Sequence, residues 1–100
     1  MQATLRRHGE GIRVSGEMTV HAARELKQPL LDALARGGAL DLSEVSEFDA
    51  AGLQLLLLAR REAGLAGHAF RIGAVSNIVR ETLALAGCEH LLAPPGEPAA

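Results

Sequence analysis

The stretch at residues 40–58 limits most strongly what this chain can fold into. Its sequence, LDLSEVSEFDAAGLQLLLL, predicts a short buried strand, an acidic turn and then the start of a very apolar helix. A helix N-terminus carries unpaired N–H groups and partial positive charge, and Asp49 stands where its carboxylate can cap them. The next residue, Ala50, is the one best placed to carry an anion at this helix start, but it has no hydroxyl.

The rest of the chain alternates between strand and helix patterns. We expect the order strand, strand, helix, strand, helix, strand, helix, at residues 2–8, 11–15, 20–36, 40–42, 50–66, 70–74 and 77–86. Alternation from residue 39 onward favours parallel pairing through right-handed crossovers, and the opening strands suit a hairpin with its turn at residues 9–11. The predicted fold class is α/β: a single mixed sheet of four to five strands, with an N-terminal hairpin and three to four helices packed on it.

Two local features add detail to this outline. Pro29 removes one hydrogen bond from the helix at residues 20–36, so a kink or a break is expected there, and Thr19 is expected to cap that helix. Residues 1–92 are predicted to form one domain, and residues 93–100, APPGEPAA, a flexible C-terminal tail.

Composition and charge disfavour several classes of function. The net charge is −2 and the chain has no Trp or Tyr, so neither a basic field nor stacking aromatics support nucleic-acid binding. The single Cys88 excludes an internal disulfide and fits a reducing compartment. No signal peptide or membrane-spanning apolar run is visible, so we expect a cytoplasmic protein without direct membrane insertion.

No residue pattern points to catalysis, a metal or a cofactor. Asp41 and Asp49 have no sequence-adjacent His or Lys to act as a partner, so a catalytic pair is not expected. Metal binding is disfavoured because no helical or strand spacing links the four histidines, His8, His21, His68 and His90. No glycine-rich phosphate-binding fingerprint occurs.

The chain contains four short motifs: Gly-Glu-Met at 16–18, Leu-Asp-Leu-Ser at 40–43, Phe-Asp-Ala-Ala-Gly-Leu at 48–53 and Gly-Ala-Val-Ser at 73–76. In their order and spacing they resemble the STAS domain of anti-sigma factor antagonists. The third motif, an Asp and two small residues before Gly-Leu in an apolar helix, is the most specific. The resemblance implies a STAS-like fold and a small regulatory module that binds a protein and has no catalytic machinery.

The resemblance also identifies a position that differs from the family pattern. In members that act as anti-anti-sigma factors, a serine-kinase anti-sigma factor binds at this helix opening, and phosphorylation of a Ser or Thr directly after the motif Asp releases it. That position is Ala50 here, so the usual phosphorylation switch is expected to be lost. Thr19 also departs from the pattern, because anti-sigma antagonists often carry an acidic residue there. Ser46 is the nearest other hydroxyl and is a candidate substitute phosphosite, with an ordinary turn serine as the alternative.

Helical geometry divides the apolar helix into two faces. At 100° per residue, Leu53, Leu56 and Leu57 are predicted to face the sheet. The opposite stripe contains Ala51, Gln54, Leu58, Arg61, Glu62 and Leu65. Its leucines are either isolated surface residues or part of a docking patch that a partner covers. The predicted partner-binding residues are Asp49, Ala50, Ala51, Gly52, Gln54, Leu58 and Arg61.

Two classes of partner remain open. The leading interpretation is a non-phosphorylatable anti-sigma factor antagonist, in an anti-anti-sigma or chemotaxis-associated signalling pathway. The alternative is a STAS subunit of a phospholipid-transport ABC system that docks on its ATPase, because the turn at Val45 and Ser46 and the multi-leucine helix resemble those subunits. Neither the identity of the partner nor the formation of a homodimer is determined by the sequence.

Overall fold

The computed structural model describes residues 3–9 and 11–92 of the chain. Its elements are the strands β1 (Thr4–His8), β2 (Gly11–Met18), β3 (Leu40–Phe48) and β4 (Ile72–Val75), the helices α1 (Val20–Leu34), α2 (Ala50–Leu65) and α3 (Asn77–Leu85), and the short 3-10 helix η1 (Glu89–Leu92). The predicted α/β class with an opening hairpin is confirmed, with a sheet of four strands. The predicted tail at residues 93–100 and the turn residue Glu10 lie outside the described residues.

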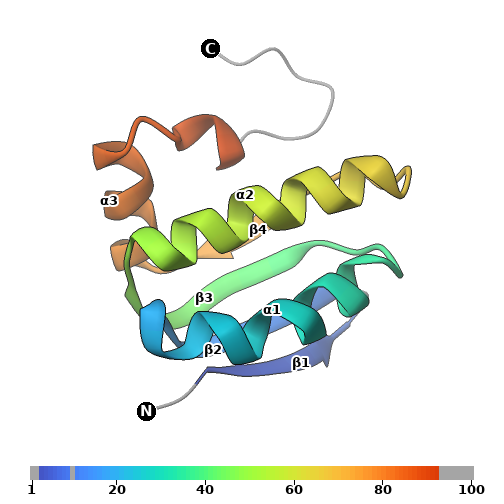
Figure 1. Cartoon of the computed structure of the whole chain (residues 1–100). Helices are drawn as coiled ribbons and strands as arrows, with labels where there is room; N and C mark the ends of the chain where they lie inside the picture. The colour runs from blue at the N-terminus through green and yellow to red at the C-terminus, as the bar shows by residue number, and fades with distance from the viewer. Residues whose placement is uncertain (1–2, 10, 93–100) are drawn as a thin grey trace.

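The strands are arranged in the sheet in the order in which they occur in the chain. β1 pairs with β2 antiparallel, whereas β2 with β3 and β3 with β4 are parallel. Right-handed crossovers in a sheet of this order put α1 and α2 on the same face, and Figure 1 shows both helices in front of the strands. Pairing of Met18 with Phe48 brings the carboxyl ends of β2 and β3 together, so α1 and α2 begin side by side.

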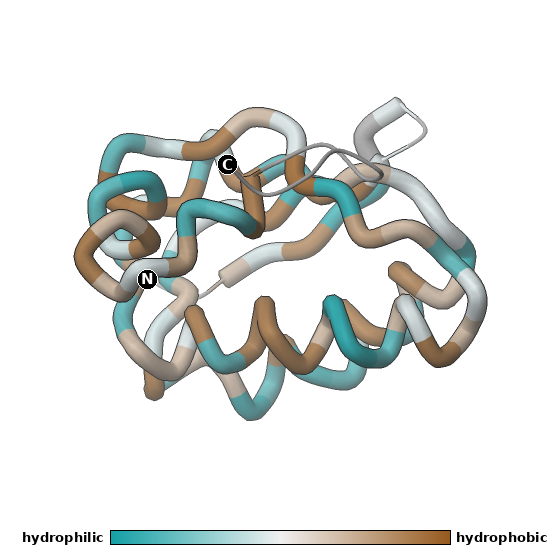
Figure 2. Tube along the Cα trace, turned by 90° about the horizontal axis from the view of Figure 1, so that it is seen from above, coloured by the Kyte–Doolittle hydropathy of each residue, from teal (hydrophilic) through white to brown (hydrophobic). Residues whose placement is uncertain are grey.

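The core lies between the sheet and these two helices. On β2 every second residue is buried, which is the period of a strand with one face against the core. Figure 2 shows hydrophobic residues recurring along the helices and along the strands. Helix α3 packs beside β3 and extends the same core. The buried residues that α1 and α3 contribute are Ala22, Leu26, Leu30, Leu34, Val79 and Leu83.

Strand β3 is longer than the predicted strand at residues 40–42. It continues through residues 43–48, which the sequence pattern predicts as an acidic turn. The register of its pairing with β2 shifts at two places, between Arg13 and Ser15 and between Gly16 and Glu17 of β2, in the way that β-bulges shift it. These shifts leave two exposed residues between successive buried ones at Leu42, Val45 and Phe48. Such a strand does not show the alternation by which strands are predicted. The turn prediction is therefore wrong, and Val45 and Ser46 lie in a strand.

Helix α1 continues without interruption through Pro29. Of the predicted kink or break, the break is therefore wrong, and the kink stays a prediction. Pro29 is exposed, and the carbonyl group that loses its donor on this face can bond to water instead of remaining unpaired. Leu26 and Leu30 are buried on either side of the proline and hold both halves of the helix against the core. Thr19 precedes the helix as predicted, but its side chain makes no capping hydrogen bond.

Candidate functional site

Asp49 caps two helices at once. One carboxylate oxygen, Oδ1, accepts hydrogen bonds from the backbone N–H groups of Ala51 at 2.9 Å and Gly52 at 3.2 Å, in the first turn of α2. The other oxygen, Oδ2, accepts from the N–H of Val20 at 3.1 Å, at the start of α1. Both helix dipoles favour a negative charge at this place. The predicted capping role of Asp49 is confirmed, and its bond to α1 replaces the cap expected from Thr19.

The hydrogen bond from the Val20 N–H group to Asp49 was not predicted, although the predicted order of strands and helices could have indicated it. Two parallel neighbouring strands that are each followed at once by a helix place both helix starts at one edge of the sheet. Here β2 ends at Met18 and β3 at Phe48, and these two residues are paired. A carboxylate at the start of the second helix can therefore reach the first N–H group of the other helix.

Gly52 allows α2 to begin close to the end of β2. A Cβ atom added at this position would overlap the Met18 carbonyl oxygen and would lie 2.9 Å from two carbon atoms of the Phe48 ring. A backbone oxygen cannot move aside without shifting its strand, so only glycine fits this approach. Gly52 is buried and supports the site from beneath, away from the surface that a partner could touch.

The other predicted partner-binding residues lie at the surface or just below it. The exposed residues of this set are Ala50, Gln54 and Arg61, and the half-buried ones are Asp49, Ala51 and Leu58. Ala50 directly follows the capping aspartate and is exposed at the start of α2. Ser46, the candidate substitute phosphosite, is exposed on β3 and not in a turn.

The apolar helix faces the core with a different side from the one predicted. Its buried residues are Gly52, Leu55, Leu56, Ala59 and Ala63. Of the three leucines predicted to face the sheet, only Leu56 is fully buried. Leu53 is partly buried, and Leu57 is 38% exposed. The prediction is displaced by about one residue, or ~100° of rotation, because α2 packs against α1 as well as against the sheet. The predicted exposure of Leu65 is confirmed, at 74%.

Leu57 is thus an exposed residue of α2 whose position at the surface the sequence pattern did not predict. It follows Ala50 by seven positions, or about two helical turns, and so lies on the same outer stripe of α2 as Ala50, Gln54 and Arg61. The signal is hidden because residues 55–58 are four successive leucines, and a continuous apolar run shows no helical period.

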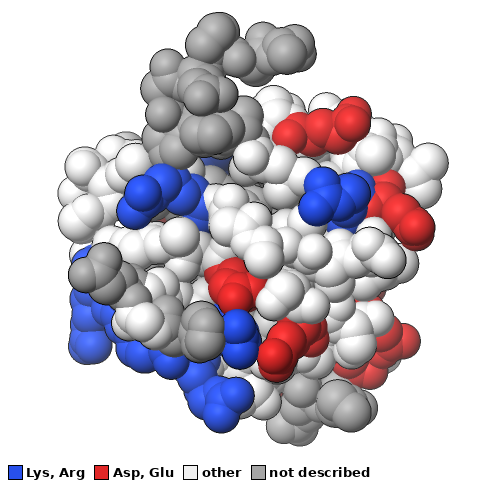
Figure 3. Space-filling model, turned by 180° about the vertical axis from the view of Figure 1, so that it is seen from behind, with Lys and Arg blue, Asp and Glu red and all other residues white. Residues whose placement is uncertain are grey.

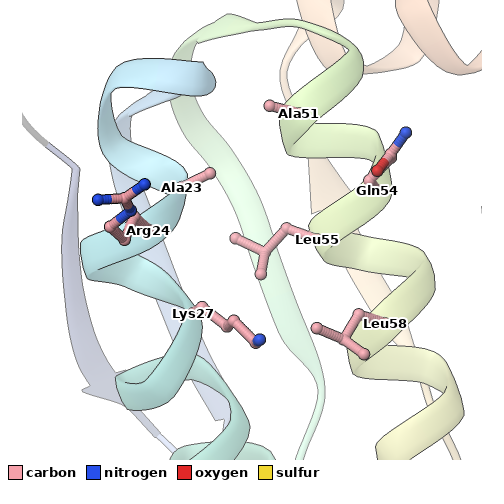
Figure 4. A pocket seen from close by; sticks show the side chains of 7 residues that line it. All are labelled: Ala23, Arg24, Lys27, Ala51, Gln54, Leu55 and Leu58. Atoms are coloured by element: carbon pink, nitrogen blue, oxygen red, sulfur yellow. The ribbon is translucent and has the colours of Figure 1, made fainter.

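A shallow groove lies between α1 and α2, next to this outer stripe. It has a volume of about 340 Å³ and is lined from α1 by Ala23, Arg24 and Lys27, and from α2 by Ala51, Gln54, Leu55 and Leu58. Figure 4 shows the side chains of Leu55 and Leu58 between the two helices, with the amine of Lys27 directed toward Leu58. Leu58 therefore faces α1 across the groove, whereas Leu57 faces away from the core.

Asp41 belongs to a separate polar cluster on the sheet. Arg13 donates from Nε at 3.2 Å and from Nη2 at 3.1 Å to its Oδ2, and from Nη1 at 3.3 Å to Glu44. Burial would raise the pKa of Asp41, but hydrogen bonds from Ser43 and Arg13 outweigh burial and hold this pKa below its usual value. Asp41 and Asp49 have different hydrogen-bond partners: Asp41 bonds to Arg13 and Ser43, and Asp49 bonds to backbone N–H groups at two helix starts.

Two further carboxyl groups meet where β2 and β3 end. Glu17 and Glu47 are paired residues of these strands. The carboxyl group of Glu47, when protonated, donates a hydrogen bond to the carboxylate of Glu17. This bond and the like charge of Glu17 raise the pKa of Glu47, and the same bond lowers the pKa of Glu17. Figure 3, seen from behind the helices, shows basic side chains gathered at the lower left and acidic side chains mostly toward the right.

The described part of the chain contains no metal cluster and no membrane span. Among residues 3–9 and 11–92, no three His, Cys, Asp or Glu side chains come together so that they could hold a metal ion. Within the same ranges, none of the helices has the length and apolar character needed to cross a membrane.

The fold is that of solved anti-sigma factor antagonists. The antagonist SpoIIAA in its unphosphorylated form superposes with a TM-score of 0.69 at 20% identity, covering 95% of this chain and 89% of that chain. An anti-sigma factor antagonist from Mycobacterium paratuberculosis superposes with a TM-score of 0.71 at 23% identity, covering 90% of this chain and 80% of that chain. At these identities the similarity concerns the fold.

The sequence itself identifies the family. A family model described as "Mlab, STAS domain" matches residues 1–93. This protein belongs to the STAS domain family, as the motifs at residues 40–43 and 48–53 indicate. No curated protein matches the chain.

Proposed function

We propose that this domain is a non-catalytic regulatory module that binds a protein partner through the start and the outer side of α2, and that phosphorylation does not switch this binding off. Membership of the STAS family and the fold of anti-sigma factor antagonists support a regulatory role. The partner class best supported is a serine-kinase anti-sigma factor or a comparable signalling protein. The proposed contact residues are Asp49, Ala50, Ala51, Gln54, Leu57, Leu58 and Arg61, with Gly52 beneath them.

Ala50 carries this proposal. It is exposed and follows Asp49 directly, at the position where the resemblance puts the phosphoacceptor Ser or Thr. A phosphate there would add a charge of about −1.5 to −2 beside Asp49, and an alanine cannot accept one. The charge of Asp49 is already directed into the fold, since its two oxygens accept hydrogen bonds from three backbone N–H groups. Residue 50 therefore adds no negative charge to the outer surface of the helix start.

The test places a permanent negative charge at this position. Purified wild type, Ala50→Glu and Ala50→Ser are titrated by calorimetry against serine-kinase anti-sigma factors encoded in the same genome. Wild type and Ala50→Ser should bind with similar affinity, and Ala50→Glu should bind at least about tenfold more weakly, or ~1.4 kcal/mol. Ala84→Glu is the matched control, because it adds the same charge to an exposed position of α3. Binding of Ala50→Glu as tight as that of the wild type would refute the proposed surface.

The absence of a switch has its own measurement. The intact mass of the protein purified from its native cells should show no phosphate. A phosphate mapped to Ser46, which is exposed on β3 and four residues before Ala50, would overturn the proposal that binding is constitutive.

A second candidate is docking on the ATPase of a phospholipid-transport system. The multi-leucine helix that carries this resemblance exposes Leu57 and Leu65, which suits a partner that covers an apolar helix face. The same three proteins titrated against the ATPase of such a system distinguish the two candidates, because only the true partner should bind the wild type and lose affinity for Ala50→Glu.

A further inference from the structure

The groove between α1 and α2 combines an apolar floor with two cations. Ala23, Leu55 and Leu58 supply the apolar surface, and Arg24 and Lys27 supply positive charge from α1. Figure 4 shows both cationic side chains on the α1 side and the leucines opposite them. No carboxylate is among the residues that line the groove. The chain as a whole has a net charge of −2, so this positive surface is a local feature.

The two cations have no partner in the part of the chain that the structure describes. Neither Arg24 nor Lys27 makes an ion pair or a hydrogen bond through its side chain with another described residue. Glu25 lies on the other side of α1, where it lines a separate hollow with Leu5. Asp49 is the carboxylate at the adjoining helix starts, and three backbone N–H groups already occupy its oxygens.

These charges decide what can cover the groove. A purely apolar partner would bury Arg24 and Lys27 without a counter-charge, which is strongly unfavourable. A basic partner would be repelled by the same two cations. A partner that brings carboxylates satisfies both cations and still allows an apolar side chain to contact Leu55 and Leu58.

We propose that this groove receives an acidic amphipathic helix of the partner protein. Arg24 and Lys27 are three residues apart on one face of α1, so carboxylates spaced by three or four residues on a helix laid along the groove can meet both. One or two leucine-like side chains of the same helix enter between Ala23 and Leu58. This inference rests on the proposed function, since it names the chemistry of the partner for the surface that adjoins Ala50.

The test uses three synthetic helical peptides with one leucine pattern and with Glu, Gln or Lys at the flanking positions. Each is titrated into isotope-labelled domain by NMR and measured by fluorescence anisotropy at low and high salt. The Glu peptide should bind most tightly, should shift the amide signals of Ala23, Lys27 and Leu58, and should weaken as salt screens the charges. The double variant Arg24→Glu/Lys27→Glu should lose about tenfold or more for the Glu peptide and gain affinity for the Lys peptide.

Controls separate charge reversal from damage to the fold. Both substituted side chains are exposed, so circular dichroism and the thermal midpoint should be unchanged. Arg80→Glu on α3 reverses an exposed charge far along the chain and should leave peptide binding unaltered. Equal binding of the Glu and Lys peptides, no binding of the Glu peptide, or signal changes confined to other surfaces would each overturn the inference.

The failure of this inference is distinguishable from failure of the proposed function. If Ala50→Glu weakens binding of the anti-sigma factor but the double charge reversal does not, the proposed function stands and the acidic-helix inference fails. If the charge reversal weakens that binding and Ala50→Glu does not, the groove is supported and the helix start is not the contact.

Discussion

Replacement of Asp49 should destabilise this domain more than the loss of an ordinary helix cap. Loss of a single N-cap costs about 0.5–2 kcal/mol, typically ~1. Asp49 caps α2 through Ala51 and Gly52 and caps α1 through Val20, so Asp49→Ala removes two caps. It also removes a charge that both helix dipoles favour, worth about 0.3–1 kcal/mol for each helix. We therefore expect a loss of about 3 kcal/mol, and a fall in Tm of roughly 12–24 °C for a domain of this size.

Asp49→Asn distinguishes a double cap from a single one. Asn and Asp are nearly equivalent at an ordinary N-cap, so a residue that capped only α2 would tolerate this change. Here the amide keeps one oxygen, which can serve α2 or α1 but not both, and the charge is lost. The expected cost is about half that of Asp49→Ala, or ~1.5 kcal/mol.

The assay is urea denaturation followed by far-ultraviolet circular dichroism, because the chain has no Trp or Tyr for fluorescence. An unchanged m-value would show that the change is in stability. Ser76→Ala is the matched control, since Ser76 precedes α3 as its N-cap but makes no side-chain capping bond, and it should cost almost nothing. Hydrogen exchange at the Val20 amide should quicken in Asp49→Asn. A neutral Asp49→Asn, or a loss of only ~1 kcal/mol for Asp49→Ala, would refute the double cap.

Three further predictions concern the helix and the sheet edge beside this cap. Gly52→Ala should cost about 3 kcal/mol or more by denaturation, because the overlap with the Met18 carbonyl oxygen outweighs the ~1 kcal/mol that alanine gains in a helix. Gly64→Ala, which has open space in the same helix, should be neutral or stabilising, and a mild effect at Gly52 would contradict the close approach. Leu57→Asp should weaken partner binding with little change in Tm, because Leu57 is exposed. Leu58→Asp should lower both the affinity for the partner and the Tm, because Leu58 is half-buried. Equal Tm values for the two variants would contradict the observed orientation of α2. Glu47→Gln should raise Tm slightly near pH 7 and not near pH 4. The pKa of Glu47 is higher in the folded state than in the unfolded state, so this group stabilises the fold at a pH below its unfolded pKa, and that contribution is lost as pH rises through its folded pKa. A Tm gain that is independent of pH and salt would exclude the Glu17 contact.

Local chemistry was sufficient to predict the helix starts and the fold class. Asp49 before two small residues marks the beginning of α2 within one residue, and Thr19 marks that of α1. Alternation on β2 and the i, i+4 spacing of Leu26 and Leu30 predict the core-facing sides of those elements. These signals are strong because each depends on residues that are close together in the sequence.

The features that were missed depend on neighbours that are distant in the sequence. The bulged pairing with β2 turns residues 43–48 into a strand whose buried residues recur at every third position. The rotation of α2 depends on its contact with α1, and four successive leucines give no period from which to predict it. The bond from Asp49 to Val20 exists only because β2 and β3 are parallel neighbours. In each case a tertiary contact selects between local patterns that the sequence permits equally.

The double cap also explains why charge at residue 50 should act as a repulsive element in this fold. A phosphate or carboxylate at a helix start is often stabilised by the free N–H groups of the first turn. Here the N–H groups of Ala51 and Gly52 already donate to Asp49, and that of Val20 does so from the neighbouring helix. A negative group introduced at Ala50 would find these donors occupied and a carboxylate beside it, so it would project toward the partner instead of folding back onto α2. In Ala50→Glu the free domain should therefore keep its native Tm while the complex weakens. A large fall in Tm for this variant would show that the new charge competes with Asp49 for the helix start.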